Sequence, residues 1–223
     1  MGRNIAKQVE EKIDIDTNYT NQERIDIIGQ KIASVCDRKD LIFHFKVLDE
    51  EDVKNAFALP GGYIYVFKDL IRGLEDDEVA AILAHEIGHV CARHSIKRLH
   101  KGLGYQIMSI LVVAGAKDAY TKRKAQEAFG HLMLANTRED ELEADKLAVK
   151  YLKKAGYDPE AVVKVVDKLI KWQMDSPPGR KRYWYTHPYL AARRSAANQA
   201  ITGEISFDDY MNVTEDEGYV IPR

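Results

Sequence analysis

The residues best suited to chemistry lie in one apolar run, VAAILAHEIGHV, at residues 79–90. Nine of its twelve residues are apolar or glycine, and the other three are His85, Glu86 and His89. At about 100° per residue, apolar side chains surround such a helix on every side, which is typical of a helix in the centre of a domain. Burying two imidazoles and a carboxylate without partners would cost on the order of several kcal/mol. The sequence must therefore supply a compensating interaction.

The spacing of the three polar residues indicates a metal ion as that interaction. His85 and His89 are four positions apart, about 40° from each other around the helix, so both rings project from one face. Two imidazoles on one face can bind a transition metal, and Zn²⁺ accepts two nitrogens together with a carboxylate. Glu86 lies about 100° from His85, beside the pair and next to water at the metal, which is the H-E-x-x-H pattern.

A catalytic zinc site needs a third protein ligand. The longer pattern H-E-x-x-H-x-x-G-x-x-H is excluded, because Ala92 and Ser95 occupy its two later positions. His94 follows His89 by five residues, about 140° around a continuous helix, and cannot reach the same metal. We expect His94 to be a surface histidine or one in the layer behind the ligands.

A separate predicted helix, residues 137–155, offers the missing ligand. Glu141 and Asp145 lie one turn apart in the middle of its apolar face, whereas Glu143 belongs to a charged stripe that faces solvent. Two buried acids need partners as much as the histidines do. Glu141 is therefore predicted to bind zinc, and Asp145 to accept a hydrogen bond from a ligand histidine. The structural alternative is a buried salt bridge to an arginine such as Arg138.

These motifs resemble the zinc metallopeptidase family of the CAAX prenyl protease and the HtpX heat-shock protease. The resemblance is carried by HEIGH at 85–89 and ELEAD at 141–145, by NAFALPGG at 55–62, and by Thr-His-Pro at 186–188 with Arg193. It covers roughly residues 20–203. The sequence looks closest to soluble periplasmic members of the β-barrel assembly-enhancing type, which implies a place in the bacterial cell envelope. A prenylated substrate is not expected, because the long apolar spans of the integral-membrane members are missing.

The same resemblance places His187 as the donor that stabilises the oxyanion formed during hydrolysis. Arg193 can reach back toward the His187 loop or toward an acid near the metal. Without substrate, the His187 ring could swing onto zinc as a fourth ligand; the alternative is a surface histidine that caps the final helix. An extended polypeptide substrate could add by β-augmentation to the strand predicted for Asn55, Ala56, Phe57 and Ala58.

The resulting prediction is a zinc-dependent endopeptidase with one Zn²⁺ per chain, held by His85, His89 and Glu141. Glu86 is the general base that takes a proton from water and later passes it to the leaving amine. Its substrates would be extended or misfolded polypeptides. One alternative is a zinc-stabilised chaperone or binding module, which would have no use for a buried base at Glu86. The other is zinc that only braces two helices, for which a closed four-ligand site would be the signature.

Around these motifs the sequence predicts a mainly helical α+β fold of the zincin type, with a small sheet early in the chain and the HExxH helix at its centre. A strand is expected at 41–48 and a hairpin at 55–66, around Pro60-Gly61-Gly62. Helices are expected at 2–14, 20–36, 76–99, 103–116, 119–135, 137–155, 159–174 and 188–201. The predicted division is an N-terminal helical arm (1–19), a metallopeptidase domain (20–203) and an acidic C-terminal tail (204–223).

Composition narrows the function further. A chain of 223 residues suits one domain, and a net charge of −2 argues against nucleic acid as a partner. Two cysteines, Cys36 and Cys91, exclude a disulfide framework and leave their own pairing open. No signal-peptide pattern is expected at the start, which leads into a charged helical segment. The apolar segment 103–116 is too short to span a bilayer, which takes about 20 residues, and is either a core helix or a lid with peripheral membrane contact.

Overall fold

The computed structural model describes residues 2–98, 136–175 and 186–204. Within these ranges the fold is α+β and mainly helical, with one small sheet early in the chain, which confirms the predicted fold class. The predicted helices at 103–116 and 119–135, including the proposed lid, lie outside the described residues, as does the acidic tail from residue 205. Among the helices within those ranges, none has the length and apolar character needed to cross a bilayer.

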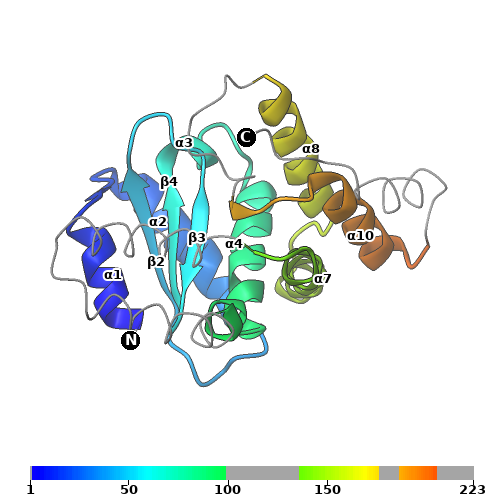
Figure 1. The fold of residues 1–223 in the computed structure, drawn as a ribbon, viewed down its shortest axis with the longest axis horizontal. Helices are drawn as coiled ribbons and strands as arrows, with labels where there is room; N and C mark the ends of the chain where they lie inside the picture. Colours follow the sequence, from blue (N-terminus) through cyan, green and yellow to red (C-terminus); the bar gives the residue numbers. More distant parts are fainter. Residues whose placement is uncertain (1, 99–135, 176–185, 205–223) are drawn as a thin grey trace, which may run out of the picture.

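Helices and strands are mixed up to residue 67, and the described residues from 68 onward form helices and their connections (Figure 1). The elements are α1 (Gly2–Glu10), β1 (Asp14–Ile15), α2 (Tyr19–Ala33), β2 (His44–Asp49), β3 (Ala56–Leu59), β4 (Tyr63–Phe67), α3 (Lys68–Ile71), α4 (Asp76–Cys91), α7 (Arg138–Ala155), α8 (Ala161–Met174) and α10 (Leu190–Thr202).

The sheet has the order β1-β2-β4-β3, so β3 is an edge strand. Strands β2 and β4 are parallel, and β3 and β4 form the predicted antiparallel hairpin, with Leu59 opposite Tyr63. The turn needs Gly62, which adopts a φ of 89°, and a Cβ there would stand 2.6 Å from the carbonyl oxygen of Ile42. Strand β2 begins three residues later than predicted, at His44 rather than Leu41.

Alternation along β4 divides the core into two layers. Ile64 and Val66 face the large cluster formed with α2, α4, α7 and α8, whereas Tyr65 and Phe67 face a smaller cluster that contains Ala6 of α1. Strand β1 also joins the sheet, by pairing with β2. The division between an N-terminal arm and a metallopeptidase domain at residue 19 stays a prediction.

Helix α4 runs through the large cluster, and every residue from Glu78 to Val90 is buried. It begins in a capping box, in which Glu75 and Glu78 satisfy each other's backbone N–H groups. The helix ends at Cys91, so the prediction of one helix over 76–99 is wrong: the helix is interrupted at residues 92–93 and helical structure resumes at His94. Arg93 adopts a left-handed φ of 60°, which ends an α-helix.

The two cysteines lie together at this end of α4. Cys36 follows α2 and is buried, and the nearby thiol of Cys91, the last residue of α4, raises its pKa. Both are free thiols.

Candidate metal centre

Helices α4 and α7 pack closely enough for their polar side chains to meet. They approach closely at Gly88, where an added Cβ would stand 3.0 Å from the carbonyl oxygen of Ala144 and 3.2 Å from its Cα. A larger residue at Gly88 would push the helices apart. The missing side chain at Gly88 therefore lets Glu141 and Asp145 of α7 reach the histidines of α4.

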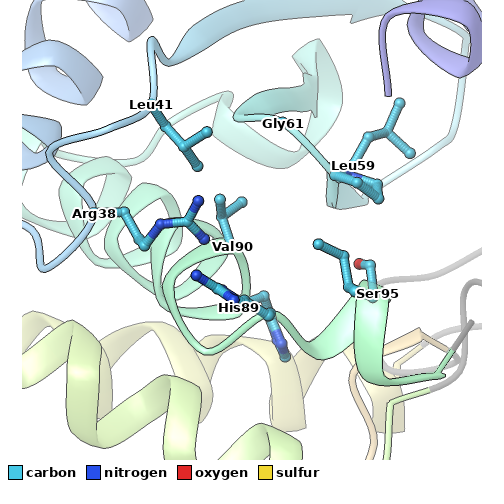
Figure 2. Close-up of a pocket in the computed structure, with 10 residues that line it drawn as sticks. Arg38, Leu41, Leu59, Gly61, His89, Val90 and Ser95 are labelled. Atoms are coloured by element: carbon cyan, nitrogen blue, oxygen red, sulfur yellow. The ribbon is translucent and has the colours of Figure 1, made fainter. Parts of the chain in front are cut away.

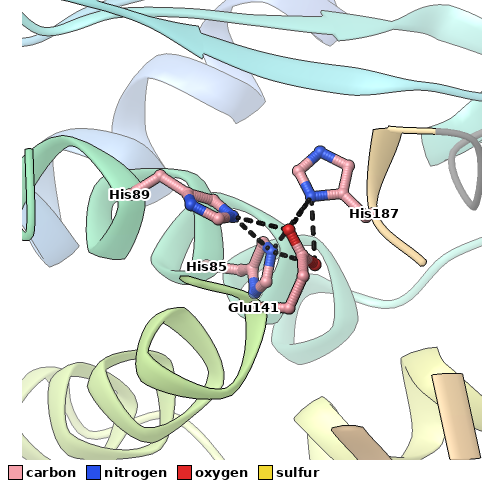
Figure 3. Close-up of side chains that lie close together, drawn as sticks. All are labelled: His85, His89, Glu141 and His187. Carbon is pink, nitrogen blue, oxygen red and sulfur yellow. Dashed lines mark hydrogen bonds and ion pairs between the residues drawn. The ribbon is translucent and has the colours of Figure 1, made fainter. Parts of the chain in front are cut away.

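Four buried side chains converge between these helices (Figure 3). His85, His89, Glu141 and His187 each offer a ligand atom, and these atoms all lie within 4.8 Å of one another. The Nε2 atoms of His85 and His89 are 2.9 Å apart. Glu141 places Oε1 3.2 Å from Nε2 of His89, and Oε2 3.4 Å from Nε2 of His85. The arrangement is the His–His–Glu set expected from the two sequence motifs, with one further histidine.

This donor set fits a divalent transition metal. The Nδ1 atom of His85 lies 2.7 Å from Oδ1 of Asp145, a carboxylate that can only accept, so Nδ1 carries hydrogen and Nε2 is left to face the cluster. The surroundings of Glu86 also fit a metal site. Its Oε1 atom is buried and receives no hydrogen bond from the described residues, although Nε2 of His187 approaches to 3.4 Å. An orphaned carboxylate oxygen beside such a cluster is where water at a metal would be expected.

The two carboxylates of α7 are held in their ionised forms. Burial alone would raise the pKa of Asp145, but the guanidinium of Arg193 and the ring of His85 lower it to about 2. Burial likewise opposes the charge on Glu141, yet His187 and Arg193 hold its pKa well below the usual range. Two buried negative charges thus face the histidines.

The pKa values of the two clustered histidines of α4 shift in opposite directions. Burial and Arg193 would lower the pKa of His85, but Asp145 and Glu141 together raise it to about 9. Burial and the charge on His85 lower the pKa of His89 well below its usual value. A bound cation among the rings would take the place of the proton on His85 and balance these carboxylates together with Arg193.

Arg193 joins the last helix to both acids of α7. Its Nε and Nη2 atoms donate to the two oxygens of Asp145 at 2.8 and 2.9 Å, and Nη1 lies 3.1 Å from Oε2 of Glu141. Nη1 also donates to the carbonyl oxygen of His187 at 3.4 Å. The arginine ion pair considered as an alternative for these acids is thus present beside the histidine contacts, with Arg193 as the partner.

His187 is buried, which excludes the surface position that was the alternative for this residue. Its Nδ1 atom lies 3.0 Å from Oε1 of Glu141 and 3.3 Å from Nε2 of His85. On the other side of the ring, Nε2 lies 3.3 Å from the carbonyl oxygen of Ala56 and 3.4 Å from Glu86. The imidazole therefore stands between the cluster and the edge strand β3.

The loop that carries His187 is fixed by two polar neighbours, Asn136 and Asn55, of which the motifs did not indicate Asn136. Asn136 donates from Nδ2 to the carbonyl oxygen of Thr186 at 3.2 Å, and the same atom lies 3.2 Å from Nδ1 of His187. The Thr186 hydroxyl donates to Oδ1 of Asn55 at 3.1 Å. Asn136 has no signal in the sequence beyond its place just before the capping residue Thr137.

His94 is also buried, and it supports His89 from behind. The Nδ1 atoms of the two rings are 2.7 Å apart, and Nε2 of His94 lies 3.2 Å from Oε2 of Glu143. The sequence argument placed His94 about 140° away on a continuous helix. Because the helix breaks at residues 92–93, it is not continuous from His89 to His94, and the two rings can come into contact. Glu143 is half exposed, on the surface as expected.

Edge strand β3 turns alternate backbone groups outward, away from β4. The bond from Phe67 N to Asn55 O fixes the alternation, so Asn55 and Phe57 bond to β4 whereas Ala56 and Ala58 turn their backbone groups outward. The outward carbonyl oxygen of Ala56 meets His187, and that of Ala58 accepts a hydrogen bond from Ser95 at 3.4 Å. Of the four residues predicted to line a substrate, Ala58 and the carbonyl group of Ala56 have the geometry for backbone pairing, whereas the N–H of Ala56 donates to Oδ1 of Asn55 at 2.9 Å.

Comparison with known proteins gives a consistent result. The family model for peptidase family M48 matches residues 19–201. The chain is 33% identical to the mitochondrial metalloendopeptidase OMA1 of Arabidopsis thaliana over 164 residues, 73% of this chain and 33% of that protein. It is 28% identical to the beta-barrel assembly-enhancing protease of Escherichia coli over 201 residues, 82% of this chain and 39% of that protein.

A third relative is the metalloprotease LoiP of Escherichia coli, 31% identical over 156 residues, 67% of this chain and 59% of that protein. The chain spans less than two thirds of the length of each of these three relatives. The family match and these names confirm the resemblance drawn from the motifs.

Proposed function

The chain belongs to peptidase family M48, and on that basis we propose that it is a zinc-dependent endopeptidase acting on extended or misfolded polypeptides. The observation that carries this proposal is the convergence of His85, His89 and Glu141, beside a buried oxygen of Glu86 that accepts no hydrogen bond from the described residues. Those three ligands are a set that Zn²⁺ accepts in catalytic sites.

Bound zinc would supply a Lewis acid that polarises the scissile carbonyl group and acidifies water. His85, His89 and Glu141 would hold it. Asp145 and His94 each engage the Nδ1 atom of one ligand histidine, which orients the ring and keeps Nε2 toward the ion. Arg193 fixes Asp145 and Glu141 in turn, so it acts as a positioning residue.

Glu86 would move the proton. Its free oxygen accepts a proton from the attacking water as the oxygen–carbon bond forms. The same carboxylate then delivers that proton to the amide nitrogen as the carbon–nitrogen bond breaks. Atoms balance, because one water and one peptide bond give a carboxylic acid and an amine.

The substrate would extend the sheet at β3. A peptide strand could pair with the outward backbone groups of Ala58 and with the carbonyl group of Ala56, which would hold it across the cluster with little dependence on its sequence. Because Nε2 of His187 lies 3.3 Å from the carbonyl oxygen of Ala56, a peptide that bonds to this oxygen would displace the ring. We place His187 as a fourth metal ligand in the resting protein and as an oxyanion donor once substrate is bound.

The position of His187 also favours a second candidate, a closed structural zinc site with four protein ligands. The orphaned oxygen of Glu86 favours the peptidase, since a structural site has no use for a buried base. For location, the similarity to two Escherichia coli proteases, one named for β-barrel assembly, favours the periplasm of a bacterial envelope and a role in protein quality control.

Glu86→Gln separates these candidates. The variant is expected to keep about one zinc per chain and to lose at least about 100-fold of the wild-type rate on unfolded casein, because general-base catalysis contributes about 10²–10⁴-fold. Metal content is measured by atomic absorption, and a chelator should abolish the wild-type activity. Loss of zinc from the variant would place Glu86 on the metal, and an unchanged rate would contradict its role as base.

A further inference from the structure

A pocket of about 180 Å³ opens beside the ligand His89 (Figure 2). It lies between the end of β3, the segment 38–41 and the C-terminal end of α4. Four apolar residues and two arginines form most of its lining: Leu41, Leu59, Val90, Ile96, Arg38 and Arg93. None of the roles assigned above uses this pocket.

The pocket has the size of one apolar side chain. An apolar cavity of about 150 Å³ in another protein holds benzene, so this volume accepts a side chain as large as leucine or phenylalanine. Its apolar walls would stabilise such a group by removing it from water.

Its position follows the edge of β3. Ser95 lines the pocket, and its hydroxyl donates to the outward carbonyl oxygen of Ala58. The preceding outward carbonyl, at Ala56, meets His187 at the metal cluster. These two points are two residues apart along a strand, about 7 Å. A peptide that pairs with both would therefore place a side chain at the pocket within about two residues of the scissile bond.

The charged side chains at the pocket do not cancel one another. Arg38 donates from two nitrogens to Asp40 at 2.7 and 2.8 Å, which neutralises its charge. Arg93 is exposed and lies close enough to the same carboxylate to help lower the pKa of Asp40, so two guanidinium groups share one acid. The pocket therefore keeps a net positive charge at its rim, which disfavours lysine and arginine side chains.

We propose that this pocket is a substrate subsite that takes one neutral apolar side chain of leucine or phenylalanine size, and that Arg93 excludes basic side chains from it. The inference rests on the proposed peptidase function and names the class of peptide that the site prefers.

The test uses quenched-fluorescence peptides that differ only within two residues of the bond cut, with leucine, phenylalanine, alanine or lysine at each position. Wild-type protein should show at one position a kcat/KM higher for leucine or phenylalanine than for alanine by about tenfold or more, the discrimination typical of an apolar pocket. Ile96→Trp should fill the pocket and reverse that preference toward alanine. Ile42→Trp is the matched control, because Ile42 is 76% exposed and does not line the pocket.

Charge selection is tested with Arg93→Asn, since asparagine tolerates the left-handed backbone found at this position. This variant should cleave the lysine peptide more readily than wild type does, whereas Lys97→Asn, outside the pocket, should not. The affinity of each peptide for zinc-loaded Glu86→Gln protein is also measured, because this variant should bind the peptides without cleaving them.

The outcomes separate the two proposals. Cleavage with no preference at any position, or a preference unchanged by Ile96→Trp, would overturn the subsite and leave the peptidase standing. Selective binding without cleavage by zinc-loaded wild-type protein would keep the subsite and overturn the peptidase. Binding that is equal for all peptides would overturn the subsite whether or not the protein cuts.

Discussion

The Nδ1 atoms of His89 and His94 lie 2.7 Å apart, within hydrogen-bond distance. This contact exists because α4 ends between the two residues. One ring must donate and the other accept. With Nε2 of His89 turned to the metal cluster, its Nδ1–H donates to His94, and the Nε2–H of His94 then points at Glu143, 3.2 Å away. Burial lowers the pKa of His94 and so favours the neutral ring that this chain of hydrogen bonds requires.

We expect His94→Ala to weaken zinc binding by about 10–100-fold without removing a ligand, the usual effect of losing a group that orients a metal-bound histidine. Competition with a chromophoric chelator measures the affinity. His44→Ala is the control, because His44 is exposed and stacks on Tyr63 in the sheet. Equal affinities in the two variants would show that the contact between the histidines does not support the site.

The two glutamates of α7 should behave differently although they are two residues apart. Glu141→Ala should strip the metal or weaken its binding by orders of magnitude, because it removes a donor atom from the cluster. Glu143→Ala should keep the metal content of wild type, because its half-exposed side chain touches only His94 and Lys97 among the contacts given by the structure. Elemental analysis of purified proteins makes the comparison. Equal metal content in both variants would overturn the assignment of Glu141.

Gly88→Ala should lower metal affinity without an equal loss of stability. Replacing glycine by alanine inside a helix favours folding by about 1 kcal/mol. The added Cβ, however, would stand 3.0 Å from a backbone oxygen of α7, which cannot rotate away as a side chain could. The helices would have to separate by a few tenths of an ångström, which moves Glu141 relative to His85 and His89. Chelator competition and thermal unfolding of the metal-free protein measure the two quantities, and unchanged affinity would show that α7 adapts.

Much of this arrangement could be predicted from local sequence signals. The Asn18 side chain accepts hydrogen bonds from the backbone N–H groups of Thr20 and Asn21, and asparagine is among the residue types that favour the start of a helix. Pro60-Gly61-Gly62 marked the hairpin. Helical periodicity placed Glu141 and Asp145 on the buried face of α7, where the structure has them. Each of these signals depends on residues within about one turn of one another.

The parts that could not be predicted depend on contacts between distant segments. No proline or glycine marks the end of α4, and Arg93 is held in a left-handed conformation that its residue type does not favour. The role of His94 followed from that break. Asn136 meets Thr186 and His187 fifty positions away, and the pocket beside His89 gathers residues from three segments. Such placements are set by packing, which periodicity does not encode.

His187 carries the last prediction, because two opposing effects meet at one ring. As a fourth metal ligand in the resting protein, the ring would hinder the binding of substrate, so its removal would favour substrate binding. As an oxyanion donor it would lower the barrier, and removing one such donor costs about 10²–10³-fold in kcat. We expect the second effect to dominate, so that His187→Ala keeps its zinc and loses kcat far more than it raises KM.

Thr186→Val is the matched control for His187→Ala. It removes the hydroxyl that donates to Asn55 and keeps the imidazole, so it tests the loop without the ring. If the ring itself stabilises the oxyanion, kcat should fall much further in His187→Ala than in Thr186→Val. Equal losses would assign the effect to the position of the loop. A kcat in His187→Ala that matches or exceeds the wild-type value would leave the ring with only its resting contact to Glu141 and His85.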